Sequence, residues 1–189
     1  NHKISFKLKK FSKLVDFKLE GLGVIDNFLL TSNNFENYND YIDLKRNIII
    51  KENKVIYKYN DDKLKLQSSG KINFNQEFDN YKFDLDYDLK KKLTNFNVVS
   101  DLNNLKINLK NFSYHKPRGN KATILINGFF NDKYKLIKDL NYSESKNNIE
   151  IKKLKLNNEY RILDFNKIFI KNFKNNIFKN NFEIKKKKK

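Results

Sequence analysis

The sequence predicts an all-β protein, built as an antiparallel meander of many strands. Two patterns support this prediction. Apolar and polar residues alternate with period two through most of the 189 residues, and successive side chains of a strand point to opposite faces of its sheet. Clusters of Asn, Asp, Ser and Gly interrupt the alternation at short intervals, as turns do between neighbouring antiparallel strands.

Each alternating run is expected to form a strand with one apolar and one polar face, and its β-branched and aromatic residues suit a pleated surface. The most regular run extends from Phe83 to Leu89, with aspartates at its alternate positions. In chain order, the apolar positions are Ile4, Phe6 and Leu8; Val15, Phe17 and Leu19; Val55, Tyr57 and Tyr59; Leu64 and Leu66; Ile72 and Phe74; Phe83, Leu85, Tyr87 and Leu89; Leu105, Ile107 and Leu109; Ala122, Ile124 and Ile126; Ile149 and Ile151; Leu154 and Leu156; and Ile168 and Ile170.

The polar clusters between these runs are predicted to be turns. They are Asn60-Asp61-Asp62, Ser68-Ser69-Gly70, Asn103-Asn104, Pro117-Arg118-Gly119-Asn120, Asn131-Asp132, Asn147-Asn148 and Asn157-Asn158. One helix is indicated between Asn34 and Arg46, where apolar residues recur every three or four positions, although a loop fits the same residues. No Pro- or Gly-rich linker divides the chain. We therefore expect one β-sheet segment over 1–184, followed by a Lys-rich tail or fragment end at 185–189.

The apolar faces of these strands need something to cover them. Helices perform this role in many folds, but the chain offers almost none. The remaining options are a sandwich of two sheets, a closed barrel, or a sheet curled into a trough whose apolar lining meets lipid. Alternation by itself does not choose among them.

The formal net charge of +18 first suggests a nucleic-acid partner. However, Arg occurs only at 46, 118 and 161, and the Arg fork is the usual reader of phosphates and base edges. Abundant Lys, Asn, Ile, Phe and Tyr, with a single Ala at Ala122, is the composition that an A/T-rich genome encodes. We interpret the charge mainly as nucleotide bias and expect no nucleic acid as partner.

The positive charge is concentrated in the second part of the chain. Residues 101–189 include 22 basic and 8 acidic residues, and the last five are lysines, Lys185 to Lys189. Such a run repels itself and is typical of a solvated tail. The alternative hypothesis is attraction to an anionic membrane surface.

Residues for catalysis or metal binding are missing. The chain has no Cys, which excludes disulfides, thiol nucleophiles and Cys-based zinc sites. His2 and His115 do not form a pair at ligand spacing. The three aspartates of the 83–89 run are flanked by lysines and lack a calcium-loop pattern, so they indicate a solvated strand face. No nucleophile, phosphate-binding or zinc-protease motif is present. We expect no enzyme, no metal and no cofactor.

The chain is expected to be part of a longer protein. It starts at Asn1 and contains no Met, which indicates a processed form or a fragment. No stretch reaches the roughly 18 consecutive apolar residues of a membrane span. Any signal peptide or membrane anchor is therefore expected outside these residues.

The stretch from Phe96 to Ile184 carries a family resemblance. A strand ending at Leu109 is followed by an aromatic-x-Lys-Pro-x-Gly turn, an Ala-containing strand through Gly128, a hairpin and a closing strand. This order resembles the AsmA-like superfamily and, within it, the large YhdP-type proteins of Gram-negative bacteria. The positions that match the family turn are Tyr114, Lys116, Pro117, Gly119 and Ala122.

The turn also has an interpretation that is independent of the family. Pro117 fixes its own φ and biases Lys116 toward extended geometry, while Gly119 permits the positive φ that reverses the chain. An ordinary surface loop would use the same residues.

The resemblance implies a curled, trough-like sheet with an apolar inner face. It implies a bridge-like periplasmic protein, anchored to the inner membrane through a segment outside this chain. Phospholipid acyl chains would lie in the trough, and the protein would transport phospholipid between the inner and outer membranes and maintain the envelope. Lining candidates are the apolar strand positions Phe83, Leu85, Tyr87, Leu105, Ile107, Leu109, Ile124, Ile126, Ile149, Ile151, Ile168 and Ile170.

Two other functions remain open on the sequence. Other AsmA-like proteins are linked to outer-membrane protein assembly, so an assembly factor, or a surface adhesin, is one alternative. A basic β-domain that binds nucleic acid or another polyanion is the second, and it predicts affinity that falls steeply with salt.

Overall fold

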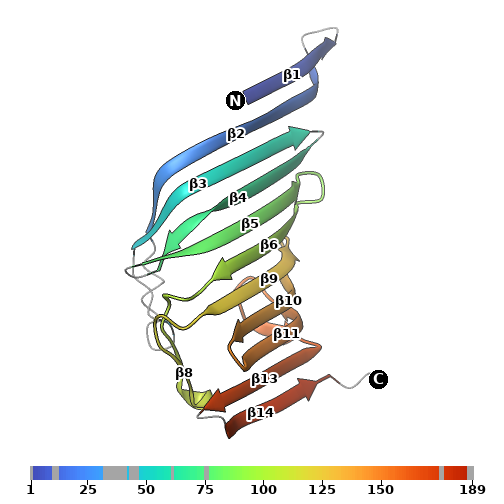
Figure 1. The fold of residues 1–189 in the computed structure, drawn as a ribbon. Coiled ribbons are helices and arrows are strands. Elements are labelled where there is room, and N and C mark those ends of the chain that lie inside the picture. Colours follow the sequence, from blue (N-terminus) through green and yellow to red (C-terminus); the bar gives the residue numbers. More distant parts are fainter. Residues whose placement is uncertain are drawn as a thin grey trace.

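The protein is built on one large open antiparallel sheet, in which the strands stack almost entirely in chain order, and a separate two-stranded sheet accompanies it (Figure 1). The structure, a computed structural model, describes residues 2–9, 13–31, 42, 47–60, 62–74, 77–174 and 177–186. The sheet has twelve strands in the order β1-β2-β3-β4-β5-β6-β9-β10-β11-β13-β14, and β12 also pairs with β11. β1 and β14 are the outermost strands at opposite ends of the stack.

The strands of the main sheet fall into two groups, separated by an excursion of the chain. The first group is β1 His2–Lys9, β2 Lys13–Thr31, β3 Asn47–Asn60, β4 Lys63–Asn73, β5 Phe78–Asp88 and β6 Leu93–Asp101. The second group is β9 Ala122–Phe130, β10 Lys135–Glu144, β11 Asn147–Leu156, β12 Ile162–Asp164, β13 Lys167–Lys174 and β14 Ile177–Lys185. The excursion contains β7 Ile107–Leu109, the 3-10 turn η3 Lys110–Phe112 and β8 Tyr114–Lys116.

The all-β antiparallel meander predicted from alternation is confirmed. Every pairing in the sheet is antiparallel, and no α-helix occurs in the described part of the chain. The sheet is not closed into a barrel. The helix considered between Asn34 and Arg46 lies outside the described residues, apart from Ile42, which forms an isolated bridge with Ile107.

One predicted turn, Ser68-Ser69-Gly70, is wrong, because β4 runs straight through it. Opposite it, β3 changes register between Lys51 and Lys54, a β-bulge that brings the β3 backbone close to β4. A Cβ on Gly70 would lie 2.8 Å from the Lys51 carbonyl oxygen. Glycine is therefore required here by the close approach of two strands and not by chain reversal.

The predicted turn at Asn147-Asn148 is displaced by two residues. Glu144 pairs directly with Asn147, so the hairpin turn is Ser145-Lys146, with Ser145 at φ 53°. Asn147 begins β11, and its side-chain Oδ1 accepts a hydrogen bond from the Phe173 amide at 2.6 Å. By contrast, turns are present at 117–120, 131–132 and 157–158, and the predicted positive φ of Gly119 is confirmed at 85°.

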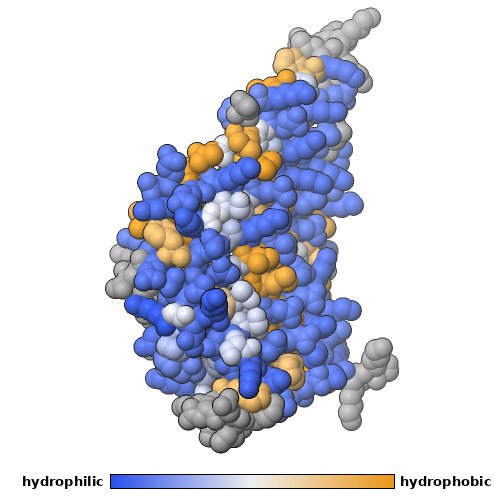
Figure 2. All heavy atoms as spheres, viewed as in Figure 1, coloured by the Kyte–Doolittle hydropathy of each residue, from blue (hydrophilic) through white to orange (hydrophobic). Residues whose placement is uncertain are grey.

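The first two residues of the terminal lysine run belong to the folded part. Lys185 is the last residue of β14, and the Nζ of Lys186 lies 2.7 and 2.8 Å from the two carboxylate oxygens of Asp164. Residues 187–189 lie outside the described part. Seen from the side of Figure 2, hydrophilic residues predominate on the surface and hydrophobic residues form separate groups.

Candidate functional site

The pairing register gathers apolar side chains into rows on one face of the sheet, here called the apolar face. Directly paired residues of antiparallel strands project to the same face. The longest row crosses nine strands, from β3 to β14, and is called the central row. It consists of Val55, Ser68, Phe83, Val98, Ile126, Leu140, Ile151, Ile168 and Ile184. Ser68 is the one polar member of this row.

A second row runs beside the central row, on the side of the sheet where the β3–β4 and β5–β6 turns lie. It consists of Tyr57, Leu66, Leu85, Phe96, Gly128, Ile137 and Leu154. Apart from the buried Gly128, these residues are only partly buried, and the same holds for Phe83, Val98 and Ile126 of the central row. Most side chains in these two rows are therefore partly accessible to solvent.

The opposite face carries the charged alternate residues. A hollow of about 510 Å³ lies there over β3–β6. Lysines and carboxylates alternate around it: Lys65 Nζ lies 3.9 Å from Asp86 Oδ2, and Gln67 donates to Asp84 at 2.9 Å. Because carboxylates stand between the lysines, this hollow does not present a uniformly positive surface to a polyanion.

Part of the apolar face is covered by residues 102–121, the excursion between β6 and β9, here called the flap. It contains β7, η3 and β8 and lies beside β10, β11 and β13, at the side of the sheet opposite the β5–β6 turn (Figure 1). It covers a third apolar row, in which Ile124, Tyr142, Ile149 and Ile170 pair in succession. The flap thus covers one margin of the face.

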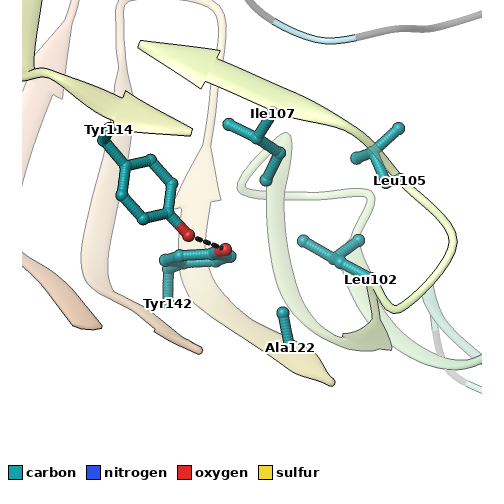
Figure 3. Packing of buried hydrophobic residues seen from close by; sticks show 6 residues of the cluster. All are labelled: Leu102, Leu105, Ile107, Tyr114, Ala122 and Tyr142. Carbon is teal, nitrogen blue, oxygen red and sulfur yellow. Dashed lines mark hydrogen bonds between the residues drawn. The ribbon is translucent and has the colours of Figure 1, made fainter. Parts of the chain in front are cut away.

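A hydrophobic cluster joins the flap to the sheet (Figure 3). Leu105 and Ile107 are 4% and 8% exposed, and they face Tyr142 and Ala122, which come from the sheet. At the far end of the flap, the rings of Phe112 and Phe182 stack at a centroid distance of 5.7 Å. Burial of several large apolar side chains is the dominant favourable term that holds such a layer in place.

Lys116 is the most deeply buried charged residue described, with 0% exposure. Its Nζ donates to three carbonyl oxygens of the flap itself: Asn103 at 2.9 Å, Leu105 at 2.8 Å and Pro117 at 3.2 Å. Burial lowers the pKa of the Lys116 ammonium, and the negative charges of Glu144 and Asp79 partly oppose this shift. The Lys116 side chain therefore links separate backbone positions of the flap to one another through hydrogen bonds.

A buried polar network ties the flap to β10. Tyr114 Oη lies 2.5 Å from Tyr142 Oη and donates to Glu144 Oε2 at 2.9 Å. Glu144 also accepts hydrogen bonds from the side-chain amides of Asn120 at 2.8 Å and Asn147 at 2.5 Å. Burial, as the largest cause, raises the pKa of Tyr114 and raises that of Tyr142 to about 12, so both hydroxyls stay neutral donors at physiological pH.

Two further polar contacts fasten the ends of the flap. Asp79, 3% exposed at the start of β5, accepts hydrogen bonds from the backbone amides of Asn103 at 3.2 Å and Asn104 at 2.9 Å. Asn172 of β13, 2% exposed, donates to the Phe112 carbonyl at 2.9 Å. The flap is therefore a fixed part of the fold.

The structure separates the predicted lining residues into two groups. Phe83, Leu85, Tyr87, Ile124, Ile126, Ile149, Ile151, Ile168 and Ile170 share the apolar face of the sheet. Leu105, Ile107 and Leu109 do not lie on this sheet, because they belong to the flap; that they line a lipid groove stays a prediction. Their alternation is real, but it places them in the layer that covers the face.

All five residues of the predicted turn motif lie in the flap or at its junction with β9. Tyr114 and Ala122 enter the buried cluster, and Lys116 forms the internal hydrogen bonds described above. Sequence reasoning missed the burial of Lys116 and the roles of Asp79 and Glu144. One signal was available, since Lys116 shares the inward parity of Tyr114.

The described residues contain no group of three or more His, Asp or Glu side chains placed to hold a metal ion. Within the same residues, no helix has the length and apolar character that crossing a bilayer requires. The candidate site is the apolar face with its flap. No protein-family model, curated protein or solved structure matches this chain.

Proposed function

We propose that this chain is a segment of a bridge-like protein of the AsmA-like, YhdP type, which carries phospholipid between the inner and outer membranes of a Gram-negative bacterium. In this proposal the segment lies in the periplasm, and an anchor outside the chain holds it to the inner membrane. Acyl chains travel along the apolar face, and headgroups remain in water. The protein performs no covalent chemistry and needs no cofactor.

The observation that carries the proposal is the central row, which crosses nine strands of an open sheet. With about 4.8 Å between strands, the row is about 38 Å long. One leaflet of a bilayer core is about 15 Å thick, so an extended acyl chain spans only three or four strands of the row. A lipid can shift from strand to strand along the row without losing apolar contact.

The flap gives the face one closed margin. It covers the row that contains Tyr142, Ile149 and Ile170, and the row that contains Leu85 and Phe96 stays partly exposed on the other side. An acyl chain on the central row would meet the flap on one side, while its headgroup reached water across the other. A sheet with one open margin suits an amphipathic cargo, because only the apolar part must leave water.

The test uses neighbouring residues that project to opposite faces of the same two strands. Val98 pairs with Ile126 on the apolar face, and Val99 pairs with Leu125 on the opposite face. The V98E/I126E variant is expected to lose at least about tenfold of the lipid that copurifies with the chain, because buried acyl chains do not tolerate charge. Mass spectrometry of the purified protein measures the loss.

The V99E/L125E variant is the matched control and is expected to retain lipid at the wild-type level. Circular dichroism checks that both variants keep their strand content. Absence of lipid from the wild-type chain, or equal loss in both variants, would contradict the proposal.

A second candidate, a factor for outer-membrane protein assembly, is favoured by the open edges of the sheet. Among the described residues, β1 and β14 each pair on one side only, and such edges accept an additional strand from a partner. Depletion of the full protein distinguishes the two functions. Altered phospholipid distribution with normal insertion of outer-membrane proteins supports the lipid proposal, and the reverse supports the assembly factor.

A further inference from the structure

The turns on the side of the sheet opposite the flap form one connected rim. The β3–β4 and β5–β6 turns are joined by the contact of Lys90 Nζ with Asp62 Oδ2 at 2.8 Å. Lys92 approaches Asp132 of the β9–β10 turn at 3.7 Å, and Asn158 of the β11–β12 loop donates to the Asp132 carbonyl at 2.8 Å. These links hold successive turns at fixed positions along the margin.

The β11–β12 loop at the end of this rim is rigidly built around Asn157. The side-chain Oδ1 of Asn157 accepts hydrogen bonds from the backbone amides of Glu159 at 3.0 Å and Arg161 at 2.8 Å. The backbone carbonyl of Asn157 accepts a hydrogen bond from the Tyr160 amide at 3.1 Å. Tyr160 is held at φ 62° and is 70% exposed. A bulky aromatic residue rarely adopts this left-handed conformation, and it persists only where surrounding contacts impose it.

Two large aliphatic side chains follow Tyr160 and are also exposed. Ile162 and Leu163 lie in β12 at 61% and 56% exposure. Three large apolar residues within four positions thus face water at one place on the rim, here called the tip. Grouped exposure of this kind marks a surface that meets a partner.

Cations surround this tip, and its carboxylates are already paired. Lys135 Nζ lies 4.2 Å from the centre of the Tyr160 ring, Lys155 Nζ lies 4.1 Å from the Tyr134 ring, and Lys133 belongs to the neighbouring turn. The carboxylates pair with other cations: Asp132 with Lys92, Glu159 with Arg161 at 3.2 Å, and Asp164 with Lys186 at 2.7 Å. Among the described residues, Lys133, Lys135 and Lys155 form no ion pair, so the tip carries a positive surplus.

We propose that this tip, Tyr160, Ile162 and Leu163 together with Lys133, Lys135 and Lys155, binds the surface of an anionic phospholipid bilayer. The apolar side chains enter the boundary between headgroups and acyl chains, where tyrosine is favoured. The lysines meet lipid phosphates, and each lysine that lies close to the headgroups adds electrostatic attraction to the anionic surface. This contact lies at the rim, beyond the central row, and does not rest on the lipid-carrier proposal.

A bilayer suits this tip better than a nucleic acid does. Phosphate contacts explain the lysines but give no role to the aliphatic pair Ile162 and Leu163, which a nucleic-acid backbone would leave exposed. A bilayer provides phosphate and hydrocarbon within a few ångströms of each other. This tip likewise presents lysines and exposed apolar side chains next to each other.

Vesicle cosedimentation of the 189-residue chain tests the proposal. Vesicles of phosphatidylcholine with an equal amount of phosphatidylglycerol are expected to bind the chain, and phosphatidylcholine alone much less. Y160S/I162S/L163S is expected to lower the partition coefficient by at least about tenfold. K133Q/K135Q is expected to lower it by about tenfold or more on the anionic vesicles.

The matched controls are I4S/F6S, at two exposed apolar residues of β1, and K54Q/K121Q, at two exposed lysines remote from the tip. Both are expected to bind like wild type. Absence of binding to anionic vesicles overturns the proposal. Binding that is unaffected by the triple serine variant and equally strong for an oligonucleotide overturns it as well, because a general attraction to polyanions then explains the result.

A fluorescent probe tests the depth of insertion directly. The chain contains no Trp, so Y160W introduces a single reporter. Its emission is expected to shift to shorter wavelength on anionic vesicles and to be quenched by lipids brominated on their acyl chains. F6W, whose position is 53% exposed on β1, is expected to show neither effect. Equal quenching of the two probes, or no quenching of the Y160W variant, would refute insertion of this tip.

Discussion

Replacement of Lys116 with methionine is expected to lower the free energy of unfolding by about 3 kcal/mol. The methionine side chain has a similar length but donates no hydrogen bond. The carbonyl groups of Asn103, Leu105 and Pro117 would then lose the donor that satisfies them inside a buried layer. The energetic penalty of burying the ammonium disappears in the variant, which limits the net loss.

Lys106→Met is the matched control for this prediction. Lys106 lies in the same flap but is exposed, and its replacement is expected to change the unfolding free energy by less than about 0.5 kcal/mol. Urea denaturation followed by circular dichroism measures both variants. Hydrogen exchange of the amides in β7 and β8 should accelerate in K116M and not in K106M. Equal stability of the two variants would show that the buried ammonium does not hold the flap.

The protein is expected to lose stability steeply above about pH 10, the ordinary pKa of tyrosine. Folding raises the pKa of Tyr142 to about 12 and also raises that of Tyr114, mainly by burial. The unfolded chain therefore releases these protons at a lower pH than the folded chain. The stabilisation that comes from the two protonated tyrosines is complete below about pH 10, and ionisation of Tyr142 alone removes on the order of 2 kcal/mol of it by about pH 12.

Tyr142→Phe isolates this effect from other titrations. Burial lowers the pKa of Lys116, which makes stability rise with pH below the ordinary lysine pKa, but that contribution is common to wild type and Y142F. Y142F is expected to be less stable than wild type by about 1 kcal/mol at neutral pH and to lose less on going to alkaline pH. Tyr160→Phe, at an exposed tyrosine, should follow the wild-type curve. Parallel curves for Y142F and wild type would rule out the buried tyrosine pair as the alkaline trigger.

Alternation predicted the strands well because the physical cause of the pattern is local. Phe83, Leu85 and Tyr87 lie on one face of β5, and Asp84 and Asp86 lie on the other, as the period of a strand requires. The turn at Asn131-Asp132 also has a local cause, because Asn131 Oδ1 accepts hydrogen bonds from the amides of Lys133 and Tyr134. These features depend only on residues that are adjacent in the chain, so they can be recognised in the sequence itself.

Alternation does not specify which layer a strand joins. Leu105, Ile107 and Leu109 repeat like a sheet strand, but the 3-10 turn that follows directs the chain back as a small hairpin over the sheet. The difference arises from contacts distant in sequence. Asp79 lies 24 and 25 residues before the two amides that it binds, and Glu144 lies 30 residues after Tyr114.

Glycine and asparagine are typical of turns, but several of them serve other purposes here. Gly70 permits β4 to approach the bulge in β3, and Gly128 does the same in β9, where a Cβ would lie 2.1 Å from the Leu136 carbonyl oxygen. Asn147 was predicted in a turn, but it connects β11 to both Glu144 and the Phe173 amide. Composition alone does not distinguish chain reversal from close packing of strands.

The most direct test of the lipid proposal is a photo-crosslinking scan along β5. Benzoylphenylalanine is placed singly at each position from 82 to 87, and the chain is irradiated in the presence of phospholipid vesicles. The proposal predicts lipid adducts with period two, at Phe83, Leu85 and Tyr87, which project from the apolar face, and none at Lys82, Asp84 and Asp86, which project from the other. Adducts of equal yield at both parities, or adducts at none, would contradict the claim that acyl chains lie on the apolar face.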